Sequence, residues 1–140
     1  MKKAVTLTIC GRQYYPDQDP EVIELTTDGT LEFVSGGWDV CYQESELTGL
    51  AGTTTTFRLE PGQVILRRTG ALRSEMIFRE GVPHDSLYRM DFGALLLTVC
   101  AKSIEAGINE NGGTIDLIYD VSIEHGQAGV VEYHLDIQAK

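Results

Sequence analysis

The feature that most restricts the fold is the segment from residue 44 to residue 81, because its strand and turn patterns leave no room for a helix. It contains three strand-like stretches, at 53–59, 64–68 and 72–79, and a glycine-containing turn follows each of them. The first stretch is rich in β-branched and aromatic side chains, and the last alternates between two faces. Short strands that recur about every ten residues are typical of a β-sandwich or a β-barrel.

Strand patterns continue on both sides of this segment. We expect further strands at residues 4–9, 22–34, 38–43, 87–92, 94–104, 115–123 and 131–137. The dipeptide Asp28-Gly29 allows either a tight hairpin or a bulge in one long strand. The apolar stretch 94–104 has a composition compatible with a helix, but its Thr and Val content and the flanking Gly93 and Gly107 favour a strand.

Nearly every expected strand alternates apolar and polar residues, so each strand buries one face. The connections are mostly short, which predicts antiparallel neighbours in a meander. A single open sheet of this size would leave exposed edges and an uncovered face, and closure into a barrel removes both. We therefore predict an all-β fold, a single antiparallel meander barrel of about eight to ten strands that spans residues 1–140 as one domain. A sandwich is the alternative architecture.

The charge balance restricts the possible partners. Asp and Glu number 21 against 11 Lys and Arg, which gives a formal net charge of -10 among 140 residues. Such a chain repels phosphate backbones and anionic membrane surfaces, so binding to nucleic acid or membrane is not expected. The first apolar run follows two lysines, but it alternates with Thr and is too short for a signal peptide. We expect an acidic, cytoplasmic protein.

The motifs of common catalytic and metal sites are missing from the sequence. The three cysteines are far apart and form no CxxC pair, and the three histidines form no HxH or HExxH pattern. The sequence also lacks a phosphate-binding P-loop and a GxSxG motif. The four consecutive threonines at 53–56 are explained by strand propensity. We predict no cofactor, no metal and no catalytic residue, and an enzyme is the less favoured class.

Strand parity predicts which side chains point into the barrel. The expected inner set is apolar and aromatic: Val5, Leu7, Trp38, Val40, Tyr42, Phe57, Leu59, Val64, Leu66, Met76, Phe78, Tyr88, Met90, Phe92, Tyr119 and Leu135. Barrels of about eight strands are either filled by such side chains or hold one small ligand. Both outcomes remain open at this level.

Arg68 is the most informative charged residue, because it shares strand parity with Val64 and Leu66 and is expected to point inward. A buried arginine requires a carboxylate partner or a bound anion. Glu44 or Glu46 would make a structural ion pair with it, which is the favoured interpretation; the alternative is an anchor for a ligand carboxylate. If a bulge shifts the parity, Arg68 lies on the surface instead. The candidate ligand-binding residues are Arg68, Glu46, Tyr42, Trp38, Tyr88, Tyr119 and Phe78.

Several stretches of the chain resemble a known family. The runs ESELTGLAGTTTTFRL, VILRRTG and SEMIFREG, followed later by SLYRMDFG and GGTIDLIYDVSIEHG, are similar to the YwiB-like family of small uncharacterised bacterial proteins. The likeness covers nearly the whole chain. It implies a calycin-like, or lipocalin-like, β-barrel of one domain, and it implies no activity.

Three functional hypotheses follow. The leading one is a barrel that binds a small apolar or carboxylate-bearing molecule in its lumen. The second is an interaction module or homodimer with a filled barrel, since Ile65, Ile77 and Ile118 fall on otherwise polar faces. The third is an enzyme that uses Glu46, Arg68 and a lumen tyrosine for acid–base chemistry at the barrel mouth.

Overall fold

The computed structural model describes residues 2–48, 50–90, 93–126 and 128–140, with the backbone alone at residues 48 and 128. The chain forms ten strands and one short 3₁₀ helix. They are β1 (Lys3–Tyr14), β2 (Glu21–Val34), β3 (Gly37–Gln43), the 3₁₀ helix η1 (Glu46–Thr48), β4 (Thr53–Glu60), β5 (Gln63–Gly70), β6 (Ser74–Phe78), β7 (Pro83–Met90), β8 (Gly93–Asn109), β9 (Gly112–Ile123) and β10 (Ala128–Ala139).

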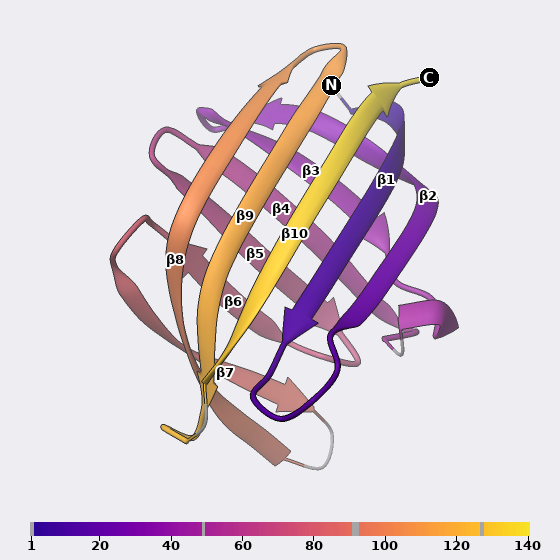
Figure 1. Cartoon of the computed structure of the whole chain (residues 1–140). Coiled ribbons are helices and arrows are strands. Elements are labelled where there is room, and N and C mark those ends of the chain that lie inside the picture. Colours follow the sequence, from indigo (N-terminus) through magenta and orange to yellow (C-terminus); the bar gives the residue numbers. More distant parts are fainter. Residues whose placement is uncertain (1, 49, 91–92, 127) are drawn as a thin grey trace.

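The ten strands form one antiparallel sheet in the order β6-β5-β4-β3-β2-β1-β10-β9-β8-β7. Consecutive strands are therefore neighbours throughout most of the sheet, and the pairing of β1 with β10 joins the two ends of the chain (Figure 1). The sheet curls on itself until β6 approaches β7 (Figure 1). The predicted antiparallel meander barrel is confirmed.

The barrel is nearly closed, because β6 and β7 are joined by isolated bridges instead of a continuous ladder. Arg73 and Arg89 exchange two backbone hydrogen bonds of 2.9 and 2.8 Å. Further along, the Ile77 N–H donates to the ring Nδ1 of His84 at 3.3 Å. The Gly81 N–H donates to the carbonyl of Ala101 at 2.9 Å. A side chain and a turn thus complete the closure where the backbone ladder stops.

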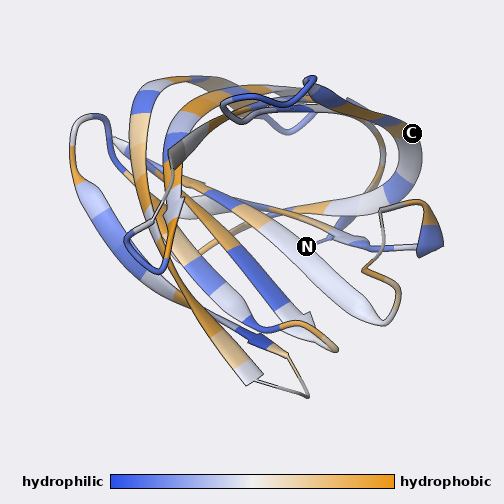
Figure 2. Cartoon of the chain, turned by 60° about the horizontal axis from the view of Figure 1, so that its bottom comes forward, coloured by the Kyte–Doolittle hydropathy of each residue, from blue (hydrophilic) through white to orange (hydrophobic). Residues whose placement is uncertain are grey.

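One face of each strand packs into the barrel interior. Hydrophobic and hydrophilic residues alternate along the strands, as Figure 2 shows, and the buried set includes Phe57, Phe78, Leu66 and Leu135, all fully covered. Of the inner residues expected from parity, Phe92 lies outside the described residues. The others are buried or half-buried, so the alternation identified the inner face correctly.

The two ambiguous stretches are resolved by their pairing. Residues 94–104 lie in β8, so the strand prediction is confirmed. Strand β2 runs unbroken through Asp28-Gly29. Its register with β1 passes both residues without a shift, and its register with β3 begins at Gly29, so neither a hairpin nor a bulge forms. Gly29 has a packing role, because a Cβ there would lie 2.6 Å from the carbonyl oxygen of Cys41. The glycine lets three strands approach closely where the sheet bends.

Candidate functional site

A cavity of about 340 Å³ lies at the end of the barrel near the β1–β2 connection. This connection is at the bottom of Figure 1. Apolar side chains from several strands form most of the cavity wall, including Ile9, Leu25, Met76, Leu97, Val121 and Val131. Ile23, Leu95 and Ile123 also line it and are 38–40% exposed, so they form an apolar mouth. A largely apolar cavity with a few polar groups is the usual composition of a small-molecule site.

A row of buried polar side chains runs from strand to strand on the inner face, and two of them, Tyr42 and Arg68, line the cavity. Tyr42 on β3 is paired with Thr55 on β4, Thr55 with Arg68 on β5, and Arg68 with Ser74 on β6. All four residues are buried and face inward. We call this row the polar belt. Direct cross-strand neighbours lie about 5 Å apart, so the belt forms a continuous band on the inner face.

Arg68 is the charged centre of the belt, and its side chain is only 9% exposed. Its Nε lies 4.0 Å from Oε2 of Glu44, whose side chain is 2% exposed. Its Nη2 donates a long hydrogen bond of 3.5 Å to the hydroxyl of Tyr133. Among the described residues, Arg68 Nε has no hydrogen-bond partner. A buried guanidinium nitrogen without an acceptor is costly, so Arg68 is a strained, charged group in the wall of the cavity.

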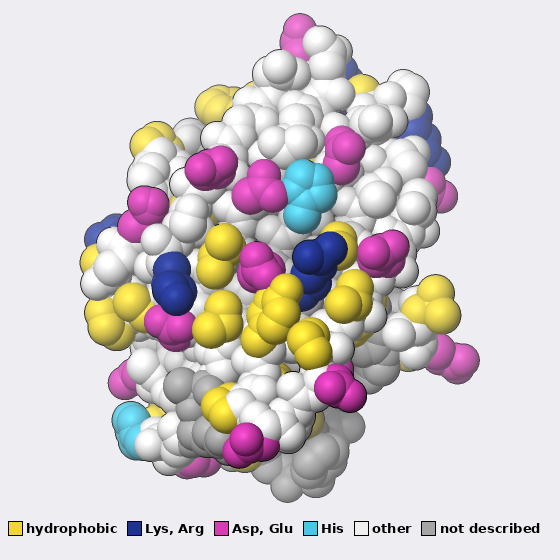
Figure 3. Space-filling model, in the orientation of Figure 1, with side chains coloured by type: hydrophobic (Ala, Val, Ile, Leu, Met, Phe, Trp, Pro, Cys, Tyr) yellow, Lys and Arg dark blue, Asp and Glu magenta, His cyan; other side chains and the backbone are white. Residues whose placement is uncertain are grey.

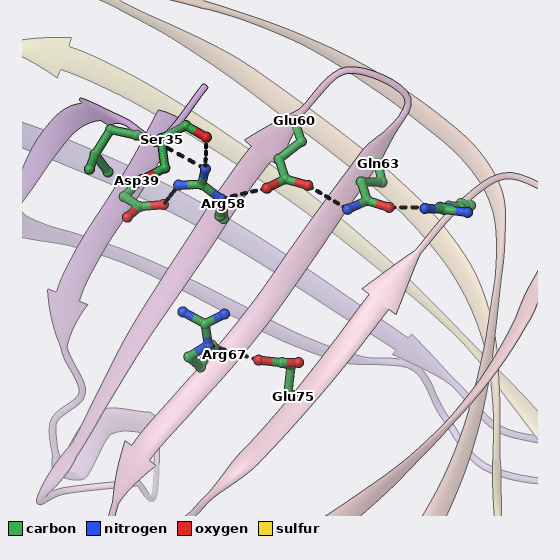
Figure 4. A network of polar contacts seen from close by, with 9 residues as sticks. Ser35, Asp39, Arg58, Glu60, Gln63, Arg67 and Glu75 are labelled. Atoms are coloured by element: carbon green, nitrogen blue, oxygen red, sulfur yellow. Dashed lines mark hydrogen bonds and ion pairs between the residues drawn. The ribbon is translucent and has the colours of Figure 1, made fainter. Parts of the chain in front are cut away.

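Two other arginines show what a satisfied guanidinium looks like in this barrel. On the outer face, Arg58 binds Asp39 at 2.9 Å and Glu60 at 2.7 Å, and it also donates to the carbonyls of residues 34 and 35 (Figure 4). Arg67 points outward and pairs with Glu75 at 2.9 Å (Figure 4). Arg68, the next residue, points inward, and its contacts among the described residues are the long bond to Tyr133 and the 4.0 Å approach to Glu44. Its guanidinium is therefore less fully bonded than those of Arg58 and Arg67.

Tyrosines surround the guanidinium. Tyr42, Tyr88, Tyr119 and Tyr133 all line the cavity, and the rings of Tyr119 and Tyr133 are stacked with centroids 6.4 Å apart. Burial raises the pKa of Tyr42, Tyr88 and Tyr119 above the ordinary value, so these hydroxyls stay neutral at physiological pH. Burial alone lowers the pKa of Arg68, but the tyrosine oxygens, Tyr133 first, outweigh it and the pKa is raised. Arg68 therefore remains charged.

Glu44 is fixed at the edge of the belt by backbone and side-chain contacts. Its N–H donates to the carbonyl of Thr53 at 2.8 Å, and the hydroxyl of Thr55 donates to Glu44 Oε2 at 2.5 Å. A carboxylate held in this way is a counter-charge for Arg68 without being hydrogen-bonded to its Nε. The two opposite charges therefore lie 4.0 Å apart in the cavity wall.

Comparison with known proteins places this barrel in a family. Residues 7–137 match the family described as a domain of unknown function, DUF1934. The chain belongs to this family. It is 28% identical over 124 residues to the uncharacterized β-barrel protein YwiB of Bacillus subtilis (strain 168). The aligned residues cover 88% of this chain and 86% of YwiB. The crystal structure of the ywiB protein from Bacillus subtilis superposes with a TM-score of 0.81 at 25% identity, covering 96% of this chain and 92% of that chain.

These matches confirm the resemblance to the YwiB-like family. They also support the ten-stranded barrel, since a solved member of the family has the same fold over nearly its whole length. What they say of function is that this is a family of uncharacterised β-barrel proteins. The chemistry of the DUF1934 cavity must therefore be argued from its own residues.

The structure brings together four of the seven candidate ligand-binding residues. Arg68, Tyr42, Tyr88 and Tyr119 line the cavity. Phe78 is fully buried and packs against Tyr119 with ring centroids 4.6 Å apart, so it supports the wall from behind. Parity correctly placed Phe78 inside the barrel but gave no information on its depth along the axis.

Trp38 and Glu46 lie elsewhere. Trp38 faces the opposite end of the barrel, where it meets Phe33 edge-to-face with centroids 5.0 Å apart. Glu46 is exposed in η1, and the described residues that line the cavity do not include it. The assignment of Glu46 to the lumen is wrong because a turn residue follows no strand parity. The acid–base hypothesis required Glu46 beside Arg68, and the structure separates the two residues.

Sequence reasoning also missed residues that line the cavity. Tyr133 has the correct parity on β10 but was not among the candidates, whereas Tyr15 lies in a segment that we expected to be a loop. Gly11 makes room for Tyr133, because a Cβ there would lie 3.2 Å from that ring. Parity could have identified Tyr133; Tyr15 offered no comparable signal.

Other surfaces offer less chemistry. Of the three isoleucines expected on outer faces, Ile65 is 9% exposed and pairs with the half-buried Ile77, and Ile118 is also half-buried. On the face shown in Figure 3, hydrophobic side chains are interspersed with acidic and basic ones. Within the described ranges, no group of three or more His, Cys, Asp or Glu could hold a metal ion, and no helix is long and apolar enough to cross a membrane.

Proposed function

We propose that this DUF1934 protein binds a small, partly apolar molecule in the barrel cavity, with the polar end of the molecule at Arg68. The observation that carries the proposal is a charged residue, Arg68, in the wall of a largely apolar cavity, with its buried Nε lacking a hydrogen-bond partner among the described residues. A folded protein rarely retains such a group unless a ligand or ordered water satisfies it.

The size and wall of the cavity agree with this proposal. A volume of 340 Å³ is at the lower end of the range for small-molecule sites, roughly 300–1,000 Å³. The apolar mouth formed by Ile23, Leu95 and Ile123 would pass an apolar chain more readily than an ion. Tyr42 and Arg68 of the polar belt lie in the wall, so a bound molecule would be oriented with its polar end toward β5.

The test is native mass spectrometry of the protein purified from its own host, searching for a co-purifying molecule. The matched variants are Leu25→Trp, which fills the cavity from β2, and Thr26→Trp, which places the same ring on the outer face of the same strand. We expect the molecule to be present in the native protein and in Thr26→Trp and absent from Leu25→Trp. Mass spectra without any bound molecule, together with no binding of apolar probes in calorimetry, would contradict the proposal.

A further inference from the structure

The charges around the cavity restrict the polar end of the ligand, and this inference rests on the proposed function. Arg68 carries one positive charge, and Glu44 supplies one negative charge 4.0 Å from its Nε. Glu21 also lines the cavity, in a protein whose formal net charge is -10. The site is therefore already balanced, or slightly negative, before a ligand enters.

A ligand carboxylate would bring a second anion against Glu44. Like charges a few ångströms apart in a poorly solvated site repel strongly, and the carboxylate would also lose its own hydration. The described groups that face Glu44 include Arg68, the hydroxyl of Thr55 and the hydroxyl of Tyr42, and the tyrosine is neutral because burial raises its pKa. These residues supply one cation for two carboxylates, so a carboxylate ligand would leave one negative charge uncompensated.

The distance between the two charged groups suggests what fits there instead. Hydrogen bonds span about 2.8 Å, so the 4.0 Å separation is too long for a direct bond. Both residues line the cavity, so a ligand group beside them meets a donor, the guanidinium of Arg68, and an acceptor, the carboxylate of Glu44. An alcohol can accept from the first and donate to the second. A primary amide offers an acceptor and a donor on adjacent atoms, whereas a carboxylate offers acceptors only.

We infer that the ligand of this cavity carries a neutral donor–acceptor group at its polar end, an alcohol or a primary amide, and that Glu44 is the residue that excludes carboxylates. The apolar body of the ligand lies against Ile9, Leu97 and Val131. Arg68 and Glu44 act together as a neutral, dipolar receptor, and neither is a simple counter-ion for a charged ligand.

Isothermal titration calorimetry with three eight-carbon probes tests the inference at pH 7.5: octanamide, 1-octanol and octanoate. These probes share the apolar chain and differ in the polar end. We expect octanamide and 1-octanol to bind the native protein at least about tenfold more tightly than octanoate, which corresponds to the usual cost of an unpaired charge. The ratio between octanamide and octanoate is the quantity compared among variants.

Glu44→Gln removes the competing charge and keeps the shape of the side chain. We expect this variant to bind octanoate about tenfold more tightly than the native protein does, because Arg68 is then left without its counter-charge. Glu46→Gln is the matched control, since it removes one negative charge from the exposed helix η1. We expect its binding ratio to equal that of the native protein.

Each outcome decides one of the two proposals. Octanoate binding as tightly as octanamide to the native protein would overturn the head-group inference and leave the binding function standing. If Glu46→Gln and Glu44→Gln change the ratio of octanamide to octanoate affinity equally, Glu44 is not the residue that excludes carboxylates. If no probe binds at saturating concentration, the binding function itself falls and the head-group inference falls with it. The native protein alone gives the first and last results, so they do not depend on a variant that folds.

Discussion

The two halves of the barrel interior are built from the same strands but have different chemistry. On β4, Phe57 fills one half, whereas Thr53 and Thr55 face the other; on β5, Leu66 and Arg68 divide in the same way. The packed half contains fully buried apolar side chains, and the cavity half contains the polar belt. The change occurs over two residues of each strand, so a barrel can change function at one end without changing its fold.

The difference between the halves is also energetic. Close-packed apolar side chains stabilise the folded state through burial and dispersion. In the cavity half, Thr53 Oγ1, Arg68 Nε, Ser74 Oγ and Ser86 Oγ are buried and find no hydrogen-bond partner among the described residues. Such groups reduce the free energy of unfolding unless water or a ligand satisfies them. The packed half therefore supports the cavity half.

The largest expected effect comes from truncating leucines in the two halves. Leu66→Ala in the packed half should lower the free energy of unfolding by about 4 kcal/mol, because its neighbours enclose the new void on all sides. Leu97→Ala, at the cavity wall, should cost about 2 kcal/mol, since one side already faces empty space. Urea denaturation measures both values. Equal costs for the two leucines would show that the cavity half is packed as tightly as the other.

The next effect isolates the buried ion pair. Arg68→Met should destabilise the protein by about 3 kcal/mol, because it removes the cation that lies beside the buried Glu44 carboxylate. Adding Glu44→Gln should restore most of this loss, which a double-mutant cycle would register as strong coupling. Arg67→Met is the control: its partner Glu75 is half exposed, and the expected cost is below about 1 kcal/mol. Additive effects at positions 68 and 44 would argue against the pair.

Alkaline pH should destabilise the protein through the buried tyrosines of the cavity half. Burial raises the pKa of Tyr42 and Tyr119 above the ordinary value of 10.0. Below pH 10 both tyrosines are protonated in both states and add no pH dependence. Above pH 10 the unfolded chain releases protons that the folded protein retains, so stability falls by about 1.4 kcal/mol per pH unit for each tyrosine.

Tyr119→Phe should reduce the decrease of the free energy of unfolding with pH by one tyrosine's contribution, as measured by denaturation curves at pH 10 and pH 11. The same variant measured between pH 7 and pH 9 serves as the control, since no difference in slope is expected there. An unchanged alkaline slope would mean that Tyr119 ionises inside the folded barrel.

The smallest effect concerns the end of the polar belt. Ser74→Ala should change the free energy of unfolding by less than about 0.5 kcal/mol, because its hydroxyl has no partner among the described residues. Thr55→Val should cost about 1.5 kcal/mol, because it removes the hydrogen bond to the Glu44 carboxylate. Thermal denaturation of both variants provides the comparison. A large loss for Ser74→Ala would reveal ordered water bound at this serine.

Much of the fold could be predicted because side chains alternate between the two faces of a strand, so the pattern of apolar residues shows which face is buried. The inward direction of Arg68, Tyr42 and Tyr119 follows from that period, as does the strand nature of residues 94–104. Depth along the barrel axis has no comparable period, so Trp38 and Phe78 could not be separated from the cavity residues. Glu44 and Glu46 could not be distinguished either, because they lie between β3 and β4, where the chain turns and parity ends.

The position of the barrel's weakest junction has a consequence for how the chain folds. Nearly all ladders are hairpins between consecutive strands, but β1 must find β10, and Val5 pairs with Ala139 at the far end of the chain. Such a pairing carries a high loop-closure entropy and raises the contact order, which slows folding. The open junction, between β6 and β7, lies at a short turn in mid-sequence. A chain rearranged to begin at β7 and to connect β10 directly to β1 would form the same sheet from local hairpins alone.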